Sequence, residues 1–308
     1  MNLKTNIITI LLALTCTFSF AQRKGPKKYK RKSNSHNRGK RQAPINYINN
    51  IQGTFFLGLA NYVGDIELRP DVWNQINPSF GIGGQYRYNQ NISFKGELNF
   101  VRVNGSDEYS ESTSLVSRNL SFATNIYEFN VGATYDLFKF NKMYRRRKKI
   151  TPYGTIGFGA FYFNPTTKLN GTKYSLRNYQ TEGQKYSPIS FSAQIGAGLR
   201  MKVTPRIDIS GEMIYKKTFT DYLDDVSTIY PTDIASWDDP TRQALSNRYE
   251  GKSFDEVTGK TRGNPDNKDG YLTIGFKLAY TLKVTQQRYN LKRNSSKLRM
   301  HKGIDKKK

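Results

Sequence analysis

Strict alternation of apolar and polar residues over long segments constrains this chain most. Across Tyr271–Val284, apolar side chains occupy every second position, and the intervening positions carry mostly Thr, Gly, Lys and Ala. Ser190–Val203 repeats the pattern, with Arg200 and Lys202 among its polar positions. Successive residues of a strand point to opposite faces of a sheet. Strands this long, apolar on one face and charged on the other, predict a closed barrel with lipid outside and a polar interior.

The first 21 residues have the pattern of a secretory signal. Lys4 forms a short basic region, Ile7–Leu14 is a compact apolar stretch, and Ser19-Phe20-Ala21 predicts cleavage directly after it. Cys16 raises the alternative of a lipoprotein, although the preceding Thr15 fits that motif poorly. Since Cys16 is the single cysteine, cleavage would leave no disulfide or thiolate metal site. We therefore expect an exported protein without disulfides.

Eight segments read as candidate strands. They are Thr54–Tyr62, Ser79–Tyr88, Ile92–Val103, Phe122–Phe138, Pro152–Phe163, Ser190–Val203, Ile207–Tyr215 and Tyr271–Val284. Bacterial barrels need an even number of antiparallel strands, and eight is the smallest common size. The predicted fold class is all-β: an eight-stranded antiparallel transmembrane β-barrel with long outer loops and basic periplasmic tails.

The connections between these strands alternate in length and so orient the barrel. Gln90-Asn91 and 204–206 are short and predict periplasmic turns, whereas 62–78, 104–121, 164–189 and 216–270 are long and predict outer loops. The link 139–151 and both termini then also face the periplasm. The predicted divisions are a signal at 1–21, a basic periplasmic arm at 22–52, the barrel at 53–284 and a basic periplasmic tail at 285–308. The predicted location is the bacterial outer membrane.

Positive charge is concentrated in three segments that this topology places on the periplasmic side. Arg23–Arg41, Lys142–Lys149 and Lys283–Lys308 hold ten, six and ten basic residues, and Asp305 is their single acid. Their combined charge equals the net charge of +25 of the whole chain. Such a field attracts a polyanionic partner, which in the periplasm is an acidic protein surface, peptidoglycan or lipid phosphate and not a nucleic acid. Solvated disordered tails are the alternative. The candidate partner-binding residues are Arg145, Arg146, Arg147, Lys148 and Lys149.

The interior of such a barrel is expected to be a filled core rather than a pore, because eight strands leave room only for side chains. The inward positions are Lys95, Glu97, Glu128, Asp136, Arg200, Asp208, Glu212 and Lys277. Buried charges of both signs should pair with each other. The two histidines, His36 and His301, lie in the basic tails, so a histidine general base within the barrel is excluded. We expect no catalytic residue, no cofactor and no metal.

Several ordered motifs resemble one family. Asn61-Tyr62-Val63-Gly64-Asp65, Thr181-Glu182-Gly183-Gln184 and the segment Thr218–Ser227 resemble its signature blocks, with Asp221, Tyr222, Asp224 and Asp225 inside the last. Pro152-Tyr153, Phe161–Pro165, Arg262-Gly263-Asn264 and Asp269-Gly270-Tyr271 fall at matching places in the order. Together these motifs are similar to the PorG-like outer-membrane barrel family of the type IX secretion system.

This resemblance implies a small accessory barrel of the type IX apparatus, associated with the periplasmic ring formed by a lipoprotein and its partner. A basic periplasmic face would dock on that ring, while membrane lipid and lipopolysaccharide would surround the barrel. Two other classes remain open from the residues. One is an envelope-anchoring barrel whose basic tails bind peptidoglycan, and the other is a small-solute barrel.

The acidic block Asp221, Asp224 and Asp225 allows two interpretations. Clustered carboxylates are ligands that calcium prefers, but the regular one-three-five spacing of a calcium loop is missing. The favoured interpretation is that Thr220 and Asp221 cap a turn that pins the long outer loop onto the barrel rim. A loop of this length, if ordered, should close the outer mouth.

Overall fold

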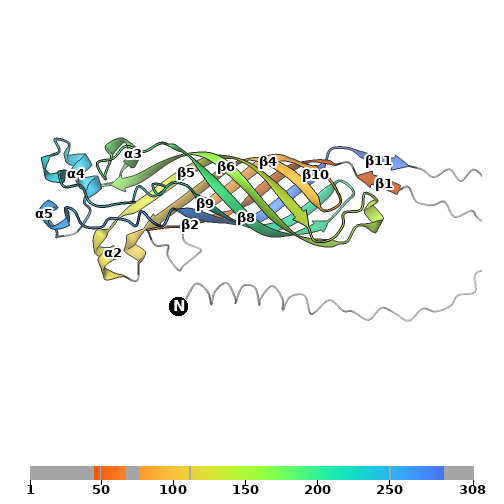
Figure 1. The fold of residues 1–308 in the computed structure, drawn as a ribbon, viewed down its shortest axis with the longest axis horizontal. Helices are drawn as coiled ribbons and strands as arrows, with labels where there is room; N and C mark the ends of the chain where they lie inside the picture. The colour runs from red at the N-terminus through yellow and green to blue at the C-terminus, as the bar shows by residue number, and fades with distance from the viewer. Residues whose placement is uncertain (1–44, 49, 67–76, 111, 250, 288–308) are drawn as a thin grey trace, which may run out of the picture. The chain divides into compact units, whose positions relative to one another are not determined.

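Figure 1 shows the fold in the computed structural model, which describes residues 45–48, 50–66, 77–110, 112–249 and 251–287. The predicted signal at 1–21, most of the predicted arm at 22–52 and residues 288–308 of the predicted tail lie outside the described residues. Within the described residues, no helix combines the length and the apolar character needed to cross a membrane.

Eight antiparallel strands close into one barrel in the described part of the chain. They are β2 (Ile51–Val63), β3 (Pro78–Arg87), β4 (Ile92–Ser106), β5 (Ser121–Asp136), β6 (Ile150–Leu169), β8 (Ile189–Lys202), β9 (Ile207–Thr218) and β10 (Gly270–Thr281). The ring closes because β10 pairs with β2, and β5 pairs with β6. Closure leaves no free edge in the wall, which is the condition for strands to cross a bilayer. The predicted fold class is confirmed.

One strand extends well beyond its predicted length. β6 continues to Leu169 and forms a hairpin with β7 (Thr172–Ser175). The turn between them is Asn170-Gly171, and both residues have positive φ, 50° and 80°. Turns of this kind require left-handed backbone, which Asn and Gly adopt most readily. The hairpin therefore carries the sheet into the outer loop region.

A two-stranded ribbon leaves the opposite end of the barrel. β1 (Ile45–Ile48) pairs with β11 (Val284–Gln287) beyond the point where β2 and β10 pair. Between the pairs Ile48↔Val284 and Gln52↔Thr281, the N-terminal side advances by four residues and the C-terminal side by three. The N-terminal side therefore holds one extra residue, as in a β-bulge. The predicted last strand is thereby divided, because β10 ends at Thr281.

Long and short connections lie at opposite ends of the barrel. The long connections carry η1 (Asp107–Tyr109), α2 (Thr113–Arg118), α3 (Leu176–Tyr179), η3 (Ile234–Ser236), α4 (Pro240–Ser246) and α5 (Phe254–Val257). We call this the loop end, at the left of Figure 1. The turn end, at the right, holds the short turns, η2 (Tyr144–Arg146) in the link 137–149, and the β1–β11 ribbon. The alternation of long and short connections is as predicted.

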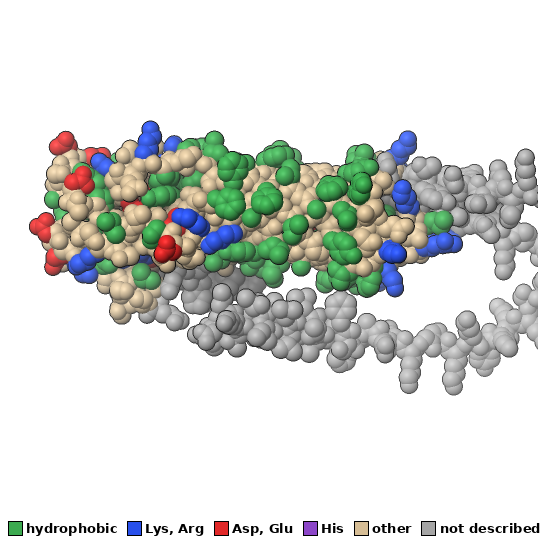
Figure 2. Space-filling model, in the orientation of Figure 1, with side chains coloured by type: hydrophobic (Ala, Val, Ile, Leu, Met, Phe, Trp, Pro, Cys, Tyr) green, Lys and Arg blue, Asp and Glu red, His purple; other side chains and the backbone are tan. Residues whose placement is uncertain are grey.

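The outward positions of the barrel strands form an apolar surface. Large side chains such as Leu98, Phe129, Ile195 and Phe276 are exposed, the last to 71%. Figure 2 shows hydrophobic side chains spread along the barrel, with Lys and Arg at both ends and Asp and Glu toward the loop end. Exposed apolar surface on this scale is costly in water and is expected only where lipid covers it. The outer face is therefore a membrane-facing surface.

The lumen is filled by paired charges, as predicted. All eight predicted inward residues are buried. The ion pairs are Arg87–Asp136, Arg200–Asp136, Lys95–Glu97, Lys277–Glu97, Lys277–Glu212, Arg147–Asp208 and Lys216–Glu128. A cavity bordered by Phe56, Lys216 and Lys277 has a volume of only about 10 Å³, about the space that one water needs.

Toward the loop end the interior changes from charged to apolar. A buried cluster forms where inward residues of the wall meet side chains of the outer loops. Its members include Val101, Val103, Phe122, Ile126, Phe161 and Phe163 from the wall, and Leu176, Leu223, Val226 and Leu245 from the loops. This layer was not predicted. It places apolar packing inside the barrel mouth and gives the loops a surface to bury against.

Candidate functional site

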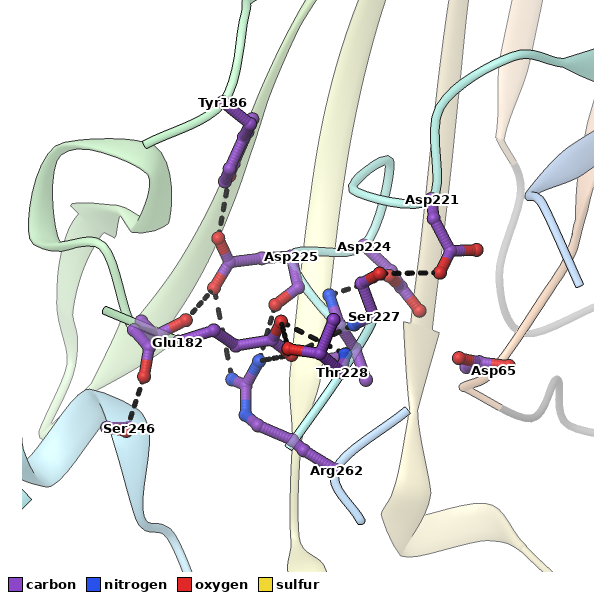
Figure 3. Close-up of polar contacts among 12 residues, drawn as sticks. Asp65, Glu182, Tyr186, Asp221, Asp224, Asp225, Ser227, Thr228, Ser246 and Arg262 are labelled. Atoms are coloured by element: carbon purple, nitrogen blue, oxygen red, sulfur yellow. Dashed lines mark hydrogen bonds and ion pairs between the residues drawn. The ribbon is translucent and has the colours of Figure 1, made fainter. Parts of the chain in front are cut away.

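Residues of widely separated motifs meet at the rim of the loop end. We call this group the rim cluster: Tyr62, Asp65, Glu182, Asp221, Asp224, Asp225, Arg262 and Asp269. Figure 3 shows Asp225 and Glu182 converging on Arg262, with Asp221 farther along the β9–β10 loop and Asp65 on the separate loop that follows β2. All but Asp65 are buried. Most of the motif residues singled out from the sequence thus form one connected site.

Arg262 is the central cation of the rim cluster. Its Nη1 lies 2.9 Å from Glu182 Oε1 and donates at 2.5 Å to the carbonyl of Asp225. Its Nη2 lies 3.9 Å from Asp225 Oδ2. The two carboxylates hold the pKa of Arg262 above its usual range despite burial. Arg262 therefore ties the Glu182 motif to the acidic block.

Glu182 accepts hydrogen bonds from the loop that follows the acidic block. Ser227 N and Thr228 N donate to its two carboxylate oxygens at 2.9 and 3.1 Å, and Thr228 Oγ1 donates at 2.8 Å. A carboxylate that accepts backbone N–H groups fixes the backbone at that point. Glu182 therefore holds the long loop between β9 and β10 against the loop that precedes β8.

Asp225 and Asp221 each bind hydroxyl groups. Asp225 accepts from Thr181 Oγ1 at 2.5 Å and from Tyr186 Oη at 2.6 Å, while Ser227 Oγ donates to Asp221 at 2.7 Å. Burial raises the pKa of Asp225 to about 6, and burial likewise raises the pKa of Asp221 to about 6. These carboxyl groups are held by neutral donors more than by cations.

Tyr62 and Asp269 complete the rim cluster. The Tyr62 hydroxyl lies 2.7 Å from Asp224 Oδ2 and 2.5 Å from Asp269 Oδ1. A side chain at Gly64 would collide with Tyr62 Oη and Asp269, so glycine is required for the chain to pass this point. Asp65 accepts a hydrogen bond from Asn264 N at 2.6 Å, which joins the Asn61–Asp65 motif to the Arg262–Asn264 motif.

Other motif residues lie outside these contacts. Asn61 and Gln184 are exposed, and Gly183 is exposed with φ of 71°. Tyr222 stacks on Tyr186 with 4.5 Å between ring centroids. Asn61, Gly183 and Gln184 shape or cover the loops, whereas the Tyr222 side chain also interacts with Glu182.

Sequence reasoning assigned no role to Arg262, Asp269 or Arg118. Arg118 forms a two-point ion pair with Asp107 at 2.6 and 2.7 Å and donates to the Arg262 carbonyl. The excess of acids in the long outer loop was a signal that a buried arginine must accompany them. No periodic pattern could have shown which arginine does so.

The contacts bear on the two interpretations of the acidic block. Among the described residues, no group of His, Cys, Asp or Glu is arranged to hold a metal ion. The carboxyl groups of Asp221, Asp224 and Asp225 instead bind side chains and backbone of neighbouring loops. Their arrangement fits the interpretation in which the block pins the long loop to the rim.

The turn end presents the second group of predicted residues. Arg145, Arg146, Lys148 and Lys149 are exposed. Arg147 requires a correction, because its guanidinium is buried, pairs with Asp208 at 2.7 Å and lies over the Phe140 ring at 4.4 Å. An unpaired lumen carboxylate is costly, which explains why one arginine of the run turns inward. The exposed basic set is therefore four residues rather than five.

Several outer-membrane proteins of known structure are similar to this chain. Solved structures with similar arrangements include the Neisserial surface protein A at 12% identity, covering 75% of this chain and 97% of that chain with a TM-score of 0.37. The outer membrane protein OprG from Pseudomonas aeruginosa matches at 9% identity, covering 77% and 96%, with a TM-score of 0.38. Ail of Yersinia pestis matches at 12% identity, covering 78% and 99%, with a TM-score of 0.33.

The search of curated proteins found no match. The closed ring and the apolar outer surface of this chain are those of an outer-membrane β-barrel. Residues 41–236, more than half of the chain, match the family described as a domain of unknown function, DUF6089. The chain therefore belongs to the DUF6089 family.

Proposed function

We propose that this protein is a non-catalytic outer-membrane subunit of the type IX secretion apparatus. In this proposal the turn end faces the periplasm and docks on the ring formed by a lipoprotein and its partner. The observation that carries the proposal is the exposed basic set, Arg145, Arg146, Lys148 and Lys149, in a link that is fixed to the barrel wall. The ordered family motifs, which converge in the rim cluster, supply the connection to type IX secretion.

The link that bears the basic set is held by contacts on both sides. Lys202 Nζ donates to the carbonyls of Tyr144 and Arg147 at 3.0 and 2.6 Å. Tyr144 Oη donates to the Val203 carbonyl at 3.0 Å, and Arg147 is paired in the lumen. A fixed array of cations binds an acidic surface at a smaller entropic cost than a flexible tail would. This geometry supports docking of a folded acidic partner.

The interior supports a structural rather than a transporting role. The charges along the lumen are ion-paired, and the loops bury apolar side chains in the mouth at the loop end. Passage of a solute would require breaking buried ion pairs, which is costly. The small-solute alternative therefore has less support than docking.

Affinity purification in mild detergent tests the proposal, with companions identified by mass spectrometry. The test variant changes Arg145, Arg146, Lys148 and Lys149 to Ser and leaves the buried Arg147 in place. The matched control changes four exposed lysines of the loop end, Lys168, Lys173, Lys185 and Lys260, to Ser. We expect the ring proteins to co-purify with the wild type and the control and to be lost from the test variant.

Other outcomes have distinct meanings. If the ring proteins never co-purify, the secretion proposal fails, and salt-sensitive binding to isolated sacculi would then favour the peptidoglycan-anchoring alternative. If the test variant retains the ring as well as the control does, the exposed basic set is not the contact surface.

A further inference from the structure

The Tyr62 hydroxyl lies between two buried carboxyl groups from opposite ends of the long loop. Asp224 Oδ2 and Asp269 Oδ1 are 2.7 and 2.5 Å from the hydroxyl oxygen. Asp65 N also donates to that oxygen at 3.2 Å. The second oxygens accept from backbone, Asp224 Oδ1 from Val226 N at 2.9 Å and Asp269 Oδ2 from Leu223 N at 2.8 Å.

Counting hydrogens shows that this arrangement needs an additional proton. A phenolic hydroxyl has one hydrogen, so it can donate to one carboxylate only. The other carboxyl group lies at hydrogen-bond distance from the same oxygen. It must supply its own hydrogen, because two oxygen atoms this close repel each other unless a hydrogen lies between them. One of Asp224 and Asp269 is therefore a neutral carboxylic acid in the folded protein.

Among the described residues, neither Asp224 nor Asp269 forms an ion pair with a Lys or Arg that could replace that proton. Tyr62 of β2, Asp65 of the following loop and Asp221, all acidic, are among the titratable groups that act on the pair. The nearest basic side chain in sequence is Lys268, whose Nζ donates to the Pro265 carbonyl. Burial, followed by the repulsion of Asp269, raises the pKa of Asp224, and burial raises the pKa of Asp269 to about 8.

We infer that Asp224 and Asp269 share a proton-binding site with Tyr62, and that the bound proton latches the long outer loop to the barrel rim. The latch holds Leu223 and Val226, whose amides it binds and whose side chains are buried in the apolar cluster of the mouth. Thr124 Oγ1 of β5 adds a hydrogen bond to the Leu223 carbonyl at 2.7 Å. Loss of the proton would place two negative charges around one hydroxyl and release this segment.

The direction of the pH effect follows from linkage. The closed loop binds the proton more tightly than an open loop, in which an aspartate has its ordinary pKa of about 3.9. The proton therefore stabilises the closed loop fully below about pH 4. Above that pH, the equilibrium constant for loop closure falls about tenfold per pH unit until the pH passes the closed-state pKa of about 8. Asp221 and Asp225 titrate near pH 6, and the described residues contain no histidine. The interval from pH 6 to 8 therefore isolates the latch.

Hydrogen exchange measured by mass spectrometry on the full-length protein in lipid nanodiscs tests the inference. We expect the protection factor of the segment 222–227, corrected for the intrinsic exchange rate, to fall by about a hundredfold between pH 6 and 8. The strand β4 provides an internal reference that should not change. Asp224→Asn supplies the missing donor as an amide, so this variant should stay protected across the interval.

Two further variants keep the test decisive. Asp221→Asn should retain the wild-type dependence between pH 6 and 8, since Asp221 titrates lower. The double variant Asp224→Asn with Asp269→Asn should lose protection at both pH values, because one of its amides must then turn an N–H toward a backbone N–H. A wild type without pH dependence in this interval, or an Asp224→Asn variant that keeps the dependence, would overturn the inference. Neither result depends on the docking partner.

Discussion

The lumen and the rim cluster stabilise buried carboxylates in different ways. In the lumen, Glu97, Glu128, Asp136, Asp208 and Glu212 each contact a Lys or Arg in an ion pair. At the rim, only Glu182 and Asp225 of the six carboxyl groups lie beside the guanidinium of Arg262, and most of the six bind hydroxyls and backbone N–H groups instead.

The difference follows from where each region lies. Inside the barrel, each of these carboxylates contacts a buried cation, which comes from a strand or, for Asp208, from Arg147 of the turn-end link. At the rim, irregular backbone supplies N–H donors to Asp224, Asp269 and Glu182. The lumen is therefore a fixed scaffold, whereas the rim cluster can respond to pH.

Removal of a lumen cation should have the largest effect. Lys277 Nζ lies 2.7 Å from both Glu97 and Glu212. Lys277→Met should lower the free energy of unfolding by about 3–5 kcal/mol, because two carboxylates lose their shared partner. Urea titration of the protein in lipid vesicles measures this. The exposed Lys149→Met is the control, and a loss below about 1 kcal/mol in Lys277→Met would show that lumen pairing matters little.

Removal of the rim cation should open the loops and leave the barrel intact. Arg262→Met leaves Glu182 and Asp225 without their buried cation. We expect the loop end to be destabilised by about 3 kcal/mol, seen as rapid proteolysis within 219–269 while the strands stay protected. Addition of Glu182→Gln should restore part of the protection, because it removes one of the uncompensated charges. Equal loss of the barrel strands would contradict the separation of the two regions.

Neighbouring arginines of the turn-end link should differ sharply. Arg147→Ala leaves Asp208 unpaired and removes the contact with Phe140, so we expect a loss of about 2–3 kcal/mol. Arg145→Ala changes an exposed residue and should stay within about 0.5 kcal/mol of the wild type. The same urea titration compares the two, and similar values would contradict the inward position of Arg147.

The smallest effect is expected at exposed acids of the loop end. Asp239 accepts from Thr241 N at 2.8 Å and caps the N-terminus of α4. Asp239→Ala should cost about 1 kcal/mol, or about fivefold faster exchange of the α4 amides. Asp238→Ala, at the adjacent exposed position, should leave that rate unchanged. An equal response of the two variants would rule out capping as the role of Asp239.

Sequence reasoning captured the wall and its charges because both follow the two-residue period of a strand. Positions such as Lys95 and Asp208 could be assigned inward from alternation alone, and their pairing followed from the cost of buried charge. The apolar layer was missed because its meaning depends on loop residues such as Leu223 that pack against it.

The contacts made by irregular segments were harder to predict from the sequence. The inward turn of Arg147 cannot be inferred from a run of five basic residues, since a link without regular structure has no period. The roles of Arg262 and Asp269 depend on contacts across the long loop. The motifs marked the rim cluster as a unit, but its hydrogen bonds required the three-dimensional arrangement.

Site-specific photo-crosslinking in the native cell tests the central claim that this barrel acts by docking at its turn end. A crosslinking amino acid would replace Arg146 in η2 or, as the matched position at the opposite end, the exposed Asp238. We expect crosslinks to the periplasmic ring proteins from position 146 and none from position 238. Ring crosslinks from position 238 alone, or from neither position, would contradict it.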